Sequence, residues 1–429
     1  MTLVTQDHNV TYAARTALPS SSPMMRQTNL SLILRHLRDH ASQSRADIAE
    51  ATGLHRATVS NLVSQLIDRR LVREIDTEHV GAIGRPRRPL ALHGTHVGAL
   101  GLEINVDHIS VHGSDLGGRV LVEHRTGFDA MAGGPDRALR VLGGMALEAV
   151  EEMRRAEAVP AGIGVAVPGL VDVAHGVVTF APNLGWRDLP LAARLSAALG
   201  PWSVPVSVGN DANLAAVAEH TSGVAAGTPH LVYLTGDVGV GGGIFVDGRP
   251  LRGADGFSGE VGHLPVDPGG ARCGCGRHGC WETKVGLAAL VRTAMPEQAG
   301  QPADLPVSGP EEHATRIATG LAAGDRRMTD AVAQIGRWLG LGGSILANLF
   351  NPRVIVVGGY FATLAEWLLP HAQAELERLV VAGSASRCRF VASDLGFGAA
   401  SRGAASMVVN RLLDHPTMIM DPPPRLSVI

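Results

Sequence analysis

The chain has 429 residues, of which 45% are hydrophobic and 18% are charged, and its formal net charge is −3. This length exceeds one ordinary domain, so we expect two or three folded units. The apolar runs are interrupted by glycine or charge, and the chain does not open with a basic segment followed by a continuous apolar stretch. We therefore expect a soluble, cytoplasmic protein with no membrane partner.

Charge is unevenly distributed along the chain. Residues 26–93 contain eleven arginines and seven acidic residues, whereas the chain from residue 94 onward contains 25 basic and 32 acidic residues. A basic segment in front of an acidic body is typical of a nucleic-acid-binding module joined to a second domain. Residues 1–25 mix Ser, Pro, Thr and Met without a period, so we predict a disordered leader.

Three helices are predicted within residues 26–93. The first shows apolar residues at helical spacing from Asn29, the second opens with a capping box at Ser44, and the third extends from about His55 to Arg69. A helix-turn-helix needs a small residue, a tight turn and an apolar plug where its two helices cross. The sequence supplies these at Ala49, Gly53 and Val59.

The third helix is the predicted recognition helix. Its early outward positions carry short or forked hydrogen-bonding side chains, which can reach base edges and phosphates in a major groove. The residues predicted to contact DNA from this helix are Arg56, Thr58, Ser60 and Asn61. A solvated helix face has a similar composition and helical hairpins also bind proteins, so the helix alone leaves those alternatives open.

Two short strands, at residues 71–75 and 88–92, flank a loop rich in Gly, Pro and Arg. Prolines hold such a loop extended while arginines project, which suits insertion into a minor groove. The arginines predicted to contact DNA here are Arg85, Arg87 and Arg88. A plain basic loop is the alternative. Together with the helices, these strands predict that residues 26–93 are a winged helix-turn-helix domain that binds double-stranded operator DNA.

From residue 94 the pattern changes to short apolar strands alternating with alanine-rich helices, which implies an α/β fold. The predicted strands are residues 98–104, 109–111, 119–122, 162–167, 206–208, 231–234 and 354–357. We expect an effector domain at 94–429 with two lobes that meet near residues 220–230 and a C-terminal tail at 415–429.

Three of the four cysteines lie within eight residues, and a histidine precedes them. A structural zinc ion takes four soft or borderline ligands in a tetrahedron. The predicted ligands of a structural Zn²⁺ are His263, Cys273, Cys275 and Cys280. A disulfide is the alternative, but pairing of Cys273 with Cys275 would be strained, and nothing else marks the chain as secreted. Cys388 is predicted to be a buried structural thiol.

Residues 98–410 resemble the ROK family of sugar kinases and sugar-responsive repressors, which share the actin-like ATPase fold. The run from Cys273 to Glu282 matches the family signature Cys-x-Cys-Gly-x-x-Gly-Cys-x-Glu at every fixed position. With the winged helix in front, residues 26–410 are similar to the repressor branch, of the xylose-repressor and N-acetylglucosamine-repressor type. The resemblance implies a winged helix-turn-helix followed by a two-lobed α/β domain of the actin-like, sugar-kinase type.

In that family a sugar binds between the lobes, and six polar residues of this chain match the sugar-binding positions. They are Asn183, Asn210, Asp211, Glu260, His263 and Glu282. Carboxylates and amides suit a sugar because its hydroxyls both donate and accept hydrogen bonds. His263 would bind zinc through one ring nitrogen and donate to a sugar hydroxyl through the other. The alternative is that Glu260 and Glu282 are solvated surface carboxylates with no role in binding.

Kinase activity is not expected. Family kinases carry Asp-x-Gly-Gly-Thr after the first strand, where amides face phosphate, but this chain has Glu103-Ile-Asn-Val-Asp107. The second loop keeps Gly239-Val-Gly-Gly-Gly243, yet Asp237 stands where the kinases usually have glycine, and a carboxylate beside phosphate is unfavourable. Asp211 matches the catalytic base of the kinases, so it would be catalytic only in a kinase and otherwise serves in binding.

The sequence therefore predicts a homodimeric or homotetrameric transcription factor, a repressor of carbohydrate metabolism genes. It would bind a two-fold-symmetric operator and respond to a sugar or sugar derivative in a zinc-supported cleft between the lobes. One rival is an ATP-dependent sugar kinase with an appended DNA-binding domain. The other is a repressor controlled by a partner protein.

Overall fold

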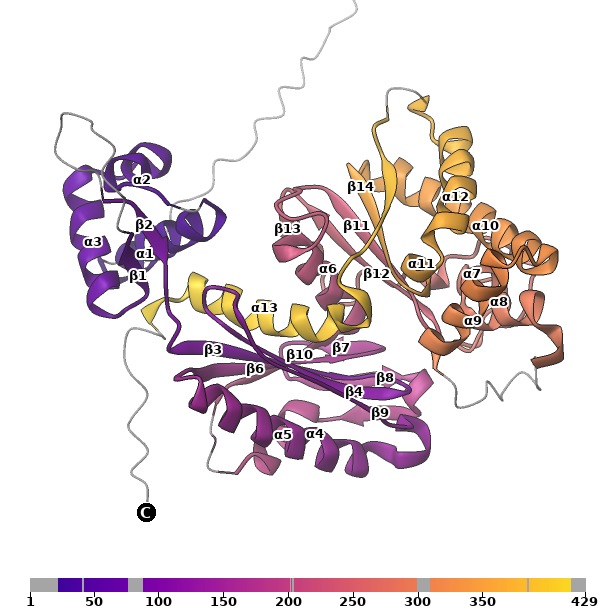
Figure 1. Cartoon of the computed structure of the whole chain (residues 1–429), viewed down its shortest axis with the longest axis horizontal. Helices are drawn as coiled ribbons and strands as arrows, with labels where there is room; N and C mark the ends of the chain where they lie inside the picture. Colours follow the sequence, from indigo (N-terminus) through magenta and orange to yellow (C-terminus); the bar gives the residue numbers. More distant parts are fainter. Residues whose placement is uncertain are drawn as a thin grey trace, which may run out of the picture.

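The computed structural model describes residues 22–40, 42–75, 88–200, 202, 204–298, 309–383 and 386–417. A small N-terminal domain is followed by a larger body built on two β-sheets (Figure 1). Most of the predicted leader, the tip of the wing and most of the predicted tail lie outside the described residues. Among the described helices, none combines the length and apolarity needed to cross a bilayer.

The N-terminal domain has the elements of a winged helix. They are α1 (Ser22–Asp39), α2 (Arg45–Thr52), α3 (Arg56–Asp68), β1 (Val72–Glu74) and β2 (Leu90–Leu92). The predicted capping box is present at Ser44, and Gly53 ends α2 in the left-handed region with a φ of 69°. The strands β1 and β2 pair antiparallel. Because α1 begins at Ser22, the first helix extends into the stretch predicted as a leader; its first turn is exposed and carries no apolar period.

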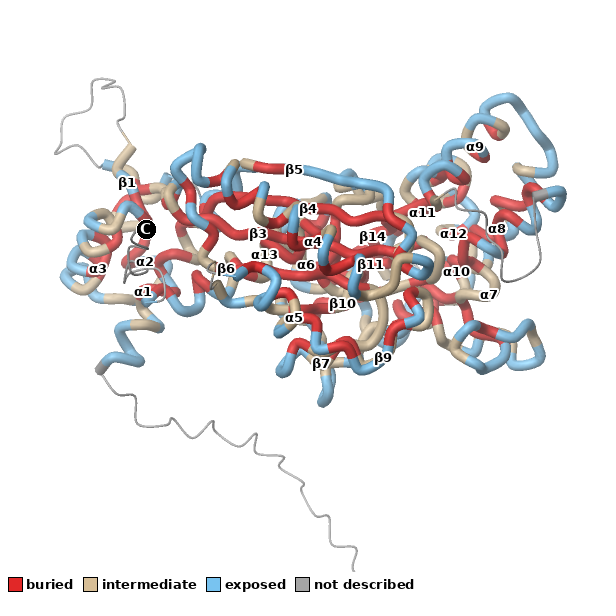
Figure 2. The backbone as a smooth tube through the Cα atoms, turned by 90° about the horizontal axis from the view of Figure 1, so that it is seen from below, coloured by how far each residue is buried: buried red, intermediate tan, exposed pale blue. Residues whose placement is uncertain are grey.

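The first lobe contains a five-stranded sheet in the order β10-β6-β3-β4-β5. Its elements are β3 (Val97–Ile104), β4 (His108–Asp115), β5 (Val120–Gly127), α4 (Ala130–Arg155), β6 (Val159–Val167), α5 (Leu191–Ala198) and β10 (Val206–Asn210). A smaller sheet is formed by β7 (Leu170–Asp172), β8 (Val177–Ala181) and β9 (Trp186–Leu189). Strands β3 and β4 are buried along their whole length, whereas the edge strand β5 is mostly exposed (Figure 2).

The second lobe repeats the topology of the first in the order β13-β12-β11-β14-β15. Its strands are β11 (Leu231–Gly236), β12 (Val240–Val246), β13 (Arg249–Pro250), β14 (Val354–Gly359) and β15 (Arg389–Ala392). Its helices are α7 (Glu282–Val285), α8 (Leu287–Ala294), α9 (Pro310–Ala322), α10 (Arg326–Phe350), α11 (Tyr360–Thr363) and α12 (Ala365–Leu379). In each lobe the first strand pairs antiparallel with the second and parallel with the fourth. All seven predicted strands overlap strands of these two sheets.

Helices α6 (Asp211–Ser222) and α13 (Ala399–Asp414) pack against each other between the two sheets (Figure 1). Helix α13 lies on the first sheet at very close range: a Cβ at Gly101 would fall 1.9 Å from the carbonyl oxygen of Ser401. In the second sheet, a Cβ at Gly243 would fall 2.4 Å from Cβ of Ala216 on α6. Gly241 and Gly243, which belong to the run that resembles a phosphate loop in sequence, therefore lie in β12 and make room for α6.

The core of the winged helix is continuous with the first lobe. Buried residues of α1, such as Leu30 and Leu34, belong to one apolar cluster with Val408 and Leu412 of α13. Polar contacts reinforce this junction, because Arg35 pairs with Asp414. The winged helix is thus packed directly on α13 and on the adjoining end of the first sheet.

Candidate functional site

The four predicted zinc ligands come together. Their ligand atoms all lie within 4.8 Å of one another. Sγ of Cys273 lies 3.7 Å from Nδ1 of His263, and Sγ of Cys275 lies 3.7 Å from Sγ of Cys280. A tetrahedron with metal–sulfur bonds of about 2.3 Å has edges of about 3.8 Å, so the donor atoms have the spacing of a zinc site. The cysteines are free thiols and form no disulfide.

Tight turns and one buried tryptophan hold this loop in place. Gly276 and Gly279 have φ values of +88° and +68°, a region that favours glycine. A Cβ at Gly279 would also lie 1.6 Å from the carbonyl oxygen of Asp267. Trp281 is fully buried and donates its indole N–H to the carbonyl of Trp338 on α10 at 2.8 Å. The loop that carries the three cysteines is therefore anchored to the core of the second lobe.

His263 stands between the cysteines and the cleft. Its Nδ1 faces Cys273, and its Nε2 lies 3.8 Å from Oε2 of Glu260. The Cys273 thiol in turn donates to Oε1 of Glu282 at 3.4 Å. Burial raises the pKa of the Cys273 thiol well above its usual range, and Glu282 adds to the rise. A thiolate at this position therefore needs a cation beside it, which fits the predicted metal.

Asn210 and Asp211 lie where β10 passes into α6. Oδ1 of Asn210 accepts from the backbone N–H of Asn213 at 3.0 Å, and its Nδ2 donates to the carbonyl of Gly169 at 3.1 Å. Asn210 thus caps α6 and also ties it to the end of β6. Burial raises the pKa of Asp211 to about 7, and three neighbouring carboxylates add to the rise. Asp211 can therefore exchange a proton near neutral pH.

The remaining predicted sugar residues gather around Gly239. A Cβ at this glycine would lie 2.5 Å from Oε2 of Glu282 and 3.4 Å from Nδ2 of Asn183, so both side chains lie against it. The same Glu282 oxygen accepts the backbone N–H of Val240 at 3.1 Å. The structure thus brings Asn183, Glu282, His263 and Glu260 into one region.

A cavity of about 30 Å³ lies between the lobes. Its polar lining consists of Glu103, Asn105, Asp211, Tyr233, Thr235 and Asp237. Of the six residues predicted to bind sugar, only Asp211 lines it. Tyr233 and Thr235 were not singled out from the sequence, although both lie on β11, the strand that leads to Asp237.

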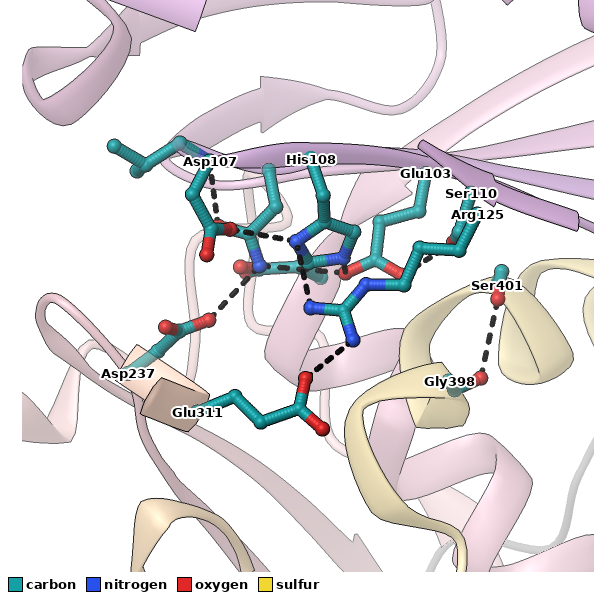
Figure 3. Close-up of polar contacts among 12 residues, drawn as sticks. Glu103, Asp107, His108, Ser110, Arg125, Asp237, Glu311, Gly398 and Ser401 are labelled. Carbon is teal, nitrogen blue, oxygen red and sulfur yellow. Dashed lines mark hydrogen bonds and ion pairs between the residues drawn. The ribbon is translucent and has the colours of Figure 1, made fainter. Parts of the chain in front are cut away.

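The two degenerate phosphate loops contact each other across the cleft (Figure 3). Nδ2 of Asn105, in the first lobe, donates to Oδ2 of Asp237, in the second, at 2.8 Å. Glu103 accepts from the hydroxyl of Ser110 at 2.9 Å. Residues 103–107 and Asp237 are the segments whose sequences resemble degenerate phosphate loops.

A second set of charges joins the lobes nearby (Figure 3). Arg125 of β5 pairs with Glu311 of α9 at 2.6 Å, and Nδ1 of His108 hydrogen-bonds with Asp107 at 2.6 Å. Burial alone lowers the pKa of His108, but hydrogen bonds with Asp107 and Glu103 outweigh it and raise that pKa to about 9. His108 is therefore an imidazolium held between carboxylates at neutral pH.

Helix α3 presents a polar face to solvent. Arg56, Ser60 and Asn61 are exposed, whereas Thr58 is half-buried at the edge of this face. Ser64, one turn beyond Ser60, is also exposed and was missed by the sequence analysis, although helical spacing places it on the same face. The contacts of these residues with DNA remain predictions.

The predicted wing is described only at its base. Arg85 and Arg87 lie outside the described residues. Arg88 is exposed and pairs with Glu74 of β1 at 3.0 Å, and Glu74 also pairs with Arg45 of α2 at 3.0 Å. Hydrogen bonds from Arg88 and Arg45 lower the pKa of Glu74. Arg88 thus helps to fix the wing to α2, a role that the sequence did not suggest.

Comparison with known proteins covers both parts of the chain. Residues 99–411 match the model of the ROK family, and residues 31–82 match a model of the MarR family. The xylose repressor of Bacillus subtilis (strain 168) is 28% identical over 397 residues, which cover 92% of this chain and 98% of that protein. The crystal structure of a ROK family transcriptional regulator, a homolog of the E. coli MLC protein, has a TM-score of 0.76 at 27% identity and covers 92% of this chain and 99% of its own.

The body alone is also similar to kinases. A ROK family glucokinase from Streptomyces griseus, in a crystal structure with glucose and AMPPNP, is 31% identical with a TM-score of 0.61. That match covers 72% of this chain and 98% of the glucokinase chain. These findings confirm the predicted fold, a winged helix-turn-helix followed by a two-lobed domain of the sugar-kinase type.

Proposed function

The chain belongs to the ROK family, and from this premise we propose that it is a transcriptional repressor whose affinity for operator DNA is set by a sugar. The observation that carries the proposal is the apolar cluster shared by α1 and α13. A winged helix packed on the helix that also borders the interlobe cavity can sense the state of the cleft, because Ala399 and Ala400 of α13 line that cavity.

The sugar is proposed to bind between the lobes to the six residues singled out above. His263 supports this assignment because its two ring nitrogens face different partners, a cysteine sulfur and the Glu260 carboxylate. Zinc, when bound, would fix the orientation of this imidazole and of the loop that ends at Glu282. Glu260, Glu282, Asn183 and Asp211 would then accept from and donate to the sugar hydroxyls.

We propose no kinase activity. Three carboxylates, those of Glu103, Asp211 and Asp237, line the interlobe cavity and would repel the phosphates of a nucleoside triphosphate bound there. The hydrogen bond from Asn105 at 2.8 Å holds the Asp237 carboxylate at this position. The relatives that span both parts of the chain are named as repressors or regulators, which also favours a sensor.

The proposed assembly is a homodimer or homotetramer, because a pair of winged helices related by a two-fold axis would match a symmetric operator. The N-terminal half of α3 would enter the major groove. Asp68 at the other end of α3 is exposed and negatively charged, which disfavours contact of that end with phosphate.

The test uses the purified full-length protein and a random library of double-stranded DNA. Enrichment of one symmetric sequence, followed by a change in its affinity on addition of a single sugar, is the expected result. Failure to enrich any sequence would refute the DNA-binding assignment. Measurement of ADP release with the same sugars decides the rival function, since sugar-dependent release would make the protein a kinase.

A further inference from the structure

Asp211 lies at the centre of a strongly acidic cleft. On one side, Glu103 and Asp237 line the same interlobe cavity. Two further carboxylates lie in the neighbouring part of the cleft, Glu260 beside His263 and Glu282 beside Gly239. The carboxylates of the cleft therefore already repel one another before any ligand enters.

The cleft contains little positive charge that could balance these carboxylates. The thirteen described residues that line the cavity include no lysine or arginine. The chain's single lysine, Lys284, is paired with Asp267 at 2.6 Å.

The nearest basic groups are already engaged. The guanidinium of Arg125 lies 5.5 Å from the ring centroid of Phe397, a cavity residue, but it is paired with Glu311 at 2.6 Å. His108 is hydrogen-bonded to Asp107 at 2.6 Å. Each cation is thus matched by a carboxylate of its own, so neither leaves a positive charge for an added anion.

The uncharged hydrogen-bond donors near the cavity are either already bonded to carboxylates or outweighed by the negative charge of those carboxylates. The amide of Asn105 donates to Asp237 at 2.8 Å and approaches Glu103 at 3.4 Å. The N-terminus of α13 faces the cavity through Ala399 and Ala400 and carries about half a positive charge. Three carboxylates line the same cavity, so the local balance stays negative.

From this distribution of charge we infer that the effector is an unphosphorylated sugar and that the cleft rejects the corresponding phosphate esters. This inference rests on the proposed function, because it concerns the ligand of the same cleft. A phosphate ester carries nearly two negative charges at neutral pH, and each would lie near several carboxylates. A hydroxyl group, by contrast, donates its proton to a carboxylate and is favoured by it.

The experiment measures thermal unfolding of the full-length protein with glucose, mannose, xylose and N-acetylglucosamine, each compared with its terminal phosphate ester. One free sugar is expected to raise the melting temperature by about 5 °C near saturation, while its ester, bound more than about 100-fold more weakly, produces no shift. An ester that binds as tightly as its sugar, or more tightly, overturns the inference. No shift with any compound would instead overturn the sugar response itself.

A variant that lacks one negative charge in the cavity tests whether this charge causes the preference for the free sugar. Asp237→Asn removes one carboxylate of the cavity, and it should narrow the difference in affinity between sugar and ester by about tenfold. Asp247→Asn serves as the matched control, because the side chain of Asp247 is 84% exposed in the turn between β12 and β13. An unchanged ratio in Asp237→Asn, equal to that of the control, would show that the cavity charge does not set the preference.

Discussion

Asn105 and Asp237 occupy equivalent positions in the two halves of the body and bond to each other at 2.8 Å. Asn105 follows directly on β3 and Asp237 follows directly on β11, the first strands of two sheets with the same topology. Both residues lie in the segments whose sequences resemble degenerate phosphate loops. Here the two segments bond to each other, so this contact joins the two lobes across the cleft.

The first prediction concerns this bond. Asn105→Ala leaves the half-buried Asp237 carboxylate without its side-chain donor, so the free energy of unfolding should fall by about 2 kcal/mol. Asn105→Asp keeps the shape of the side chain but should lower the free energy of unfolding more than Asn105→Ala, because it adds a carboxylate that faces Asp237 and Glu103. Denaturant titration of the three proteins checks the order. A smaller loss for Asn105→Asp than for Asn105→Ala would contradict the assignment.

The second prediction concerns pH. The pKa of His108 is raised to about 9 from its ordinary value of 6.5, by Asp107 and Glu103 acting against burial and against Arg125. The imidazolium therefore stabilises the folded protein fully below about pH 6.5, and this contribution is lost as the pH rises through about 9. The free energy of unfolding of the wild-type protein should fall by up to about 3 kcal/mol over that pH range, whereas that of His108→Gln should not.

A second histidine of the same strand provides the control for that measurement. Burial lowers the pKa of His112 to about 4, with Arg402 adding to the effect, so this side chain is neutral throughout the range. His112→Gln should follow the wild-type dependence of unfolding free energy on pH. Equal slopes for all three proteins would mean that His108 is not charged in the fold.

The third prediction concerns the metal. Cys275→Ser removes one of four donor atoms, so the zinc content measured by mass spectrometry should fall from about one ion per chain to a small fraction of that. The melting temperature should fall with it. Cys388→Ser is the matched control, because Cys388 is buried elsewhere in the second lobe. Full zinc content in Cys275→Ser would exclude this residue from the site.

The fourth prediction concerns DNA. Arg56→Ala should weaken binding to every sequence and reduce the slope of affinity against salt by about one unit, as expected for one lost phosphate contact. Asn61→Ala should instead relax the preference at a single base pair by about 1–3 kcal/mol. Arg378→Ala, an exposed arginine on α12, should change neither quantity. Binding curves at several salt concentrations separate the three outcomes.

Local patterns predicted much of this molecule from sequence. The capping box at Ser44 and the left-handed Gly53 were predicted correctly because helix ends are set by nearby residues. The grouping of His263 with the three cysteines followed from spacing and ligand chemistry. In each case the decisive residues lie within about twenty positions of one another.

Contacts between the lobes could not be predicted in the same way. Asn105 and Asp237 are 132 residues apart, and nothing in either segment signals the other. The packing role of Gly241 and Gly243 was not predicted, because the close approach of α6 to these glycines exists only in three dimensions. The pairing of Arg88 with Glu74 on the opposite strand was not predicted either, and contact of Arg88 with DNA stays a prediction.

The last prediction concerns communication between cleft and DNA, and it depends on the proposed function. Helix α13 borders the cavity at Ala400 and enters the winged-helix core at Leu412. Leu412→Ala should cost about 2–5 kcal/mol and loosen that junction, so the sugar should still bind while its effect on DNA affinity shrinks towards none. Leu376→Ala makes a similar cavity in the core of the second lobe and should retain the effect. If both variants lose the effect of the sugar on DNA affinity, general destabilisation is the cause of the loss. If Leu412→Ala keeps the full effect, α13 does not transmit the signal from the cleft to the winged helix.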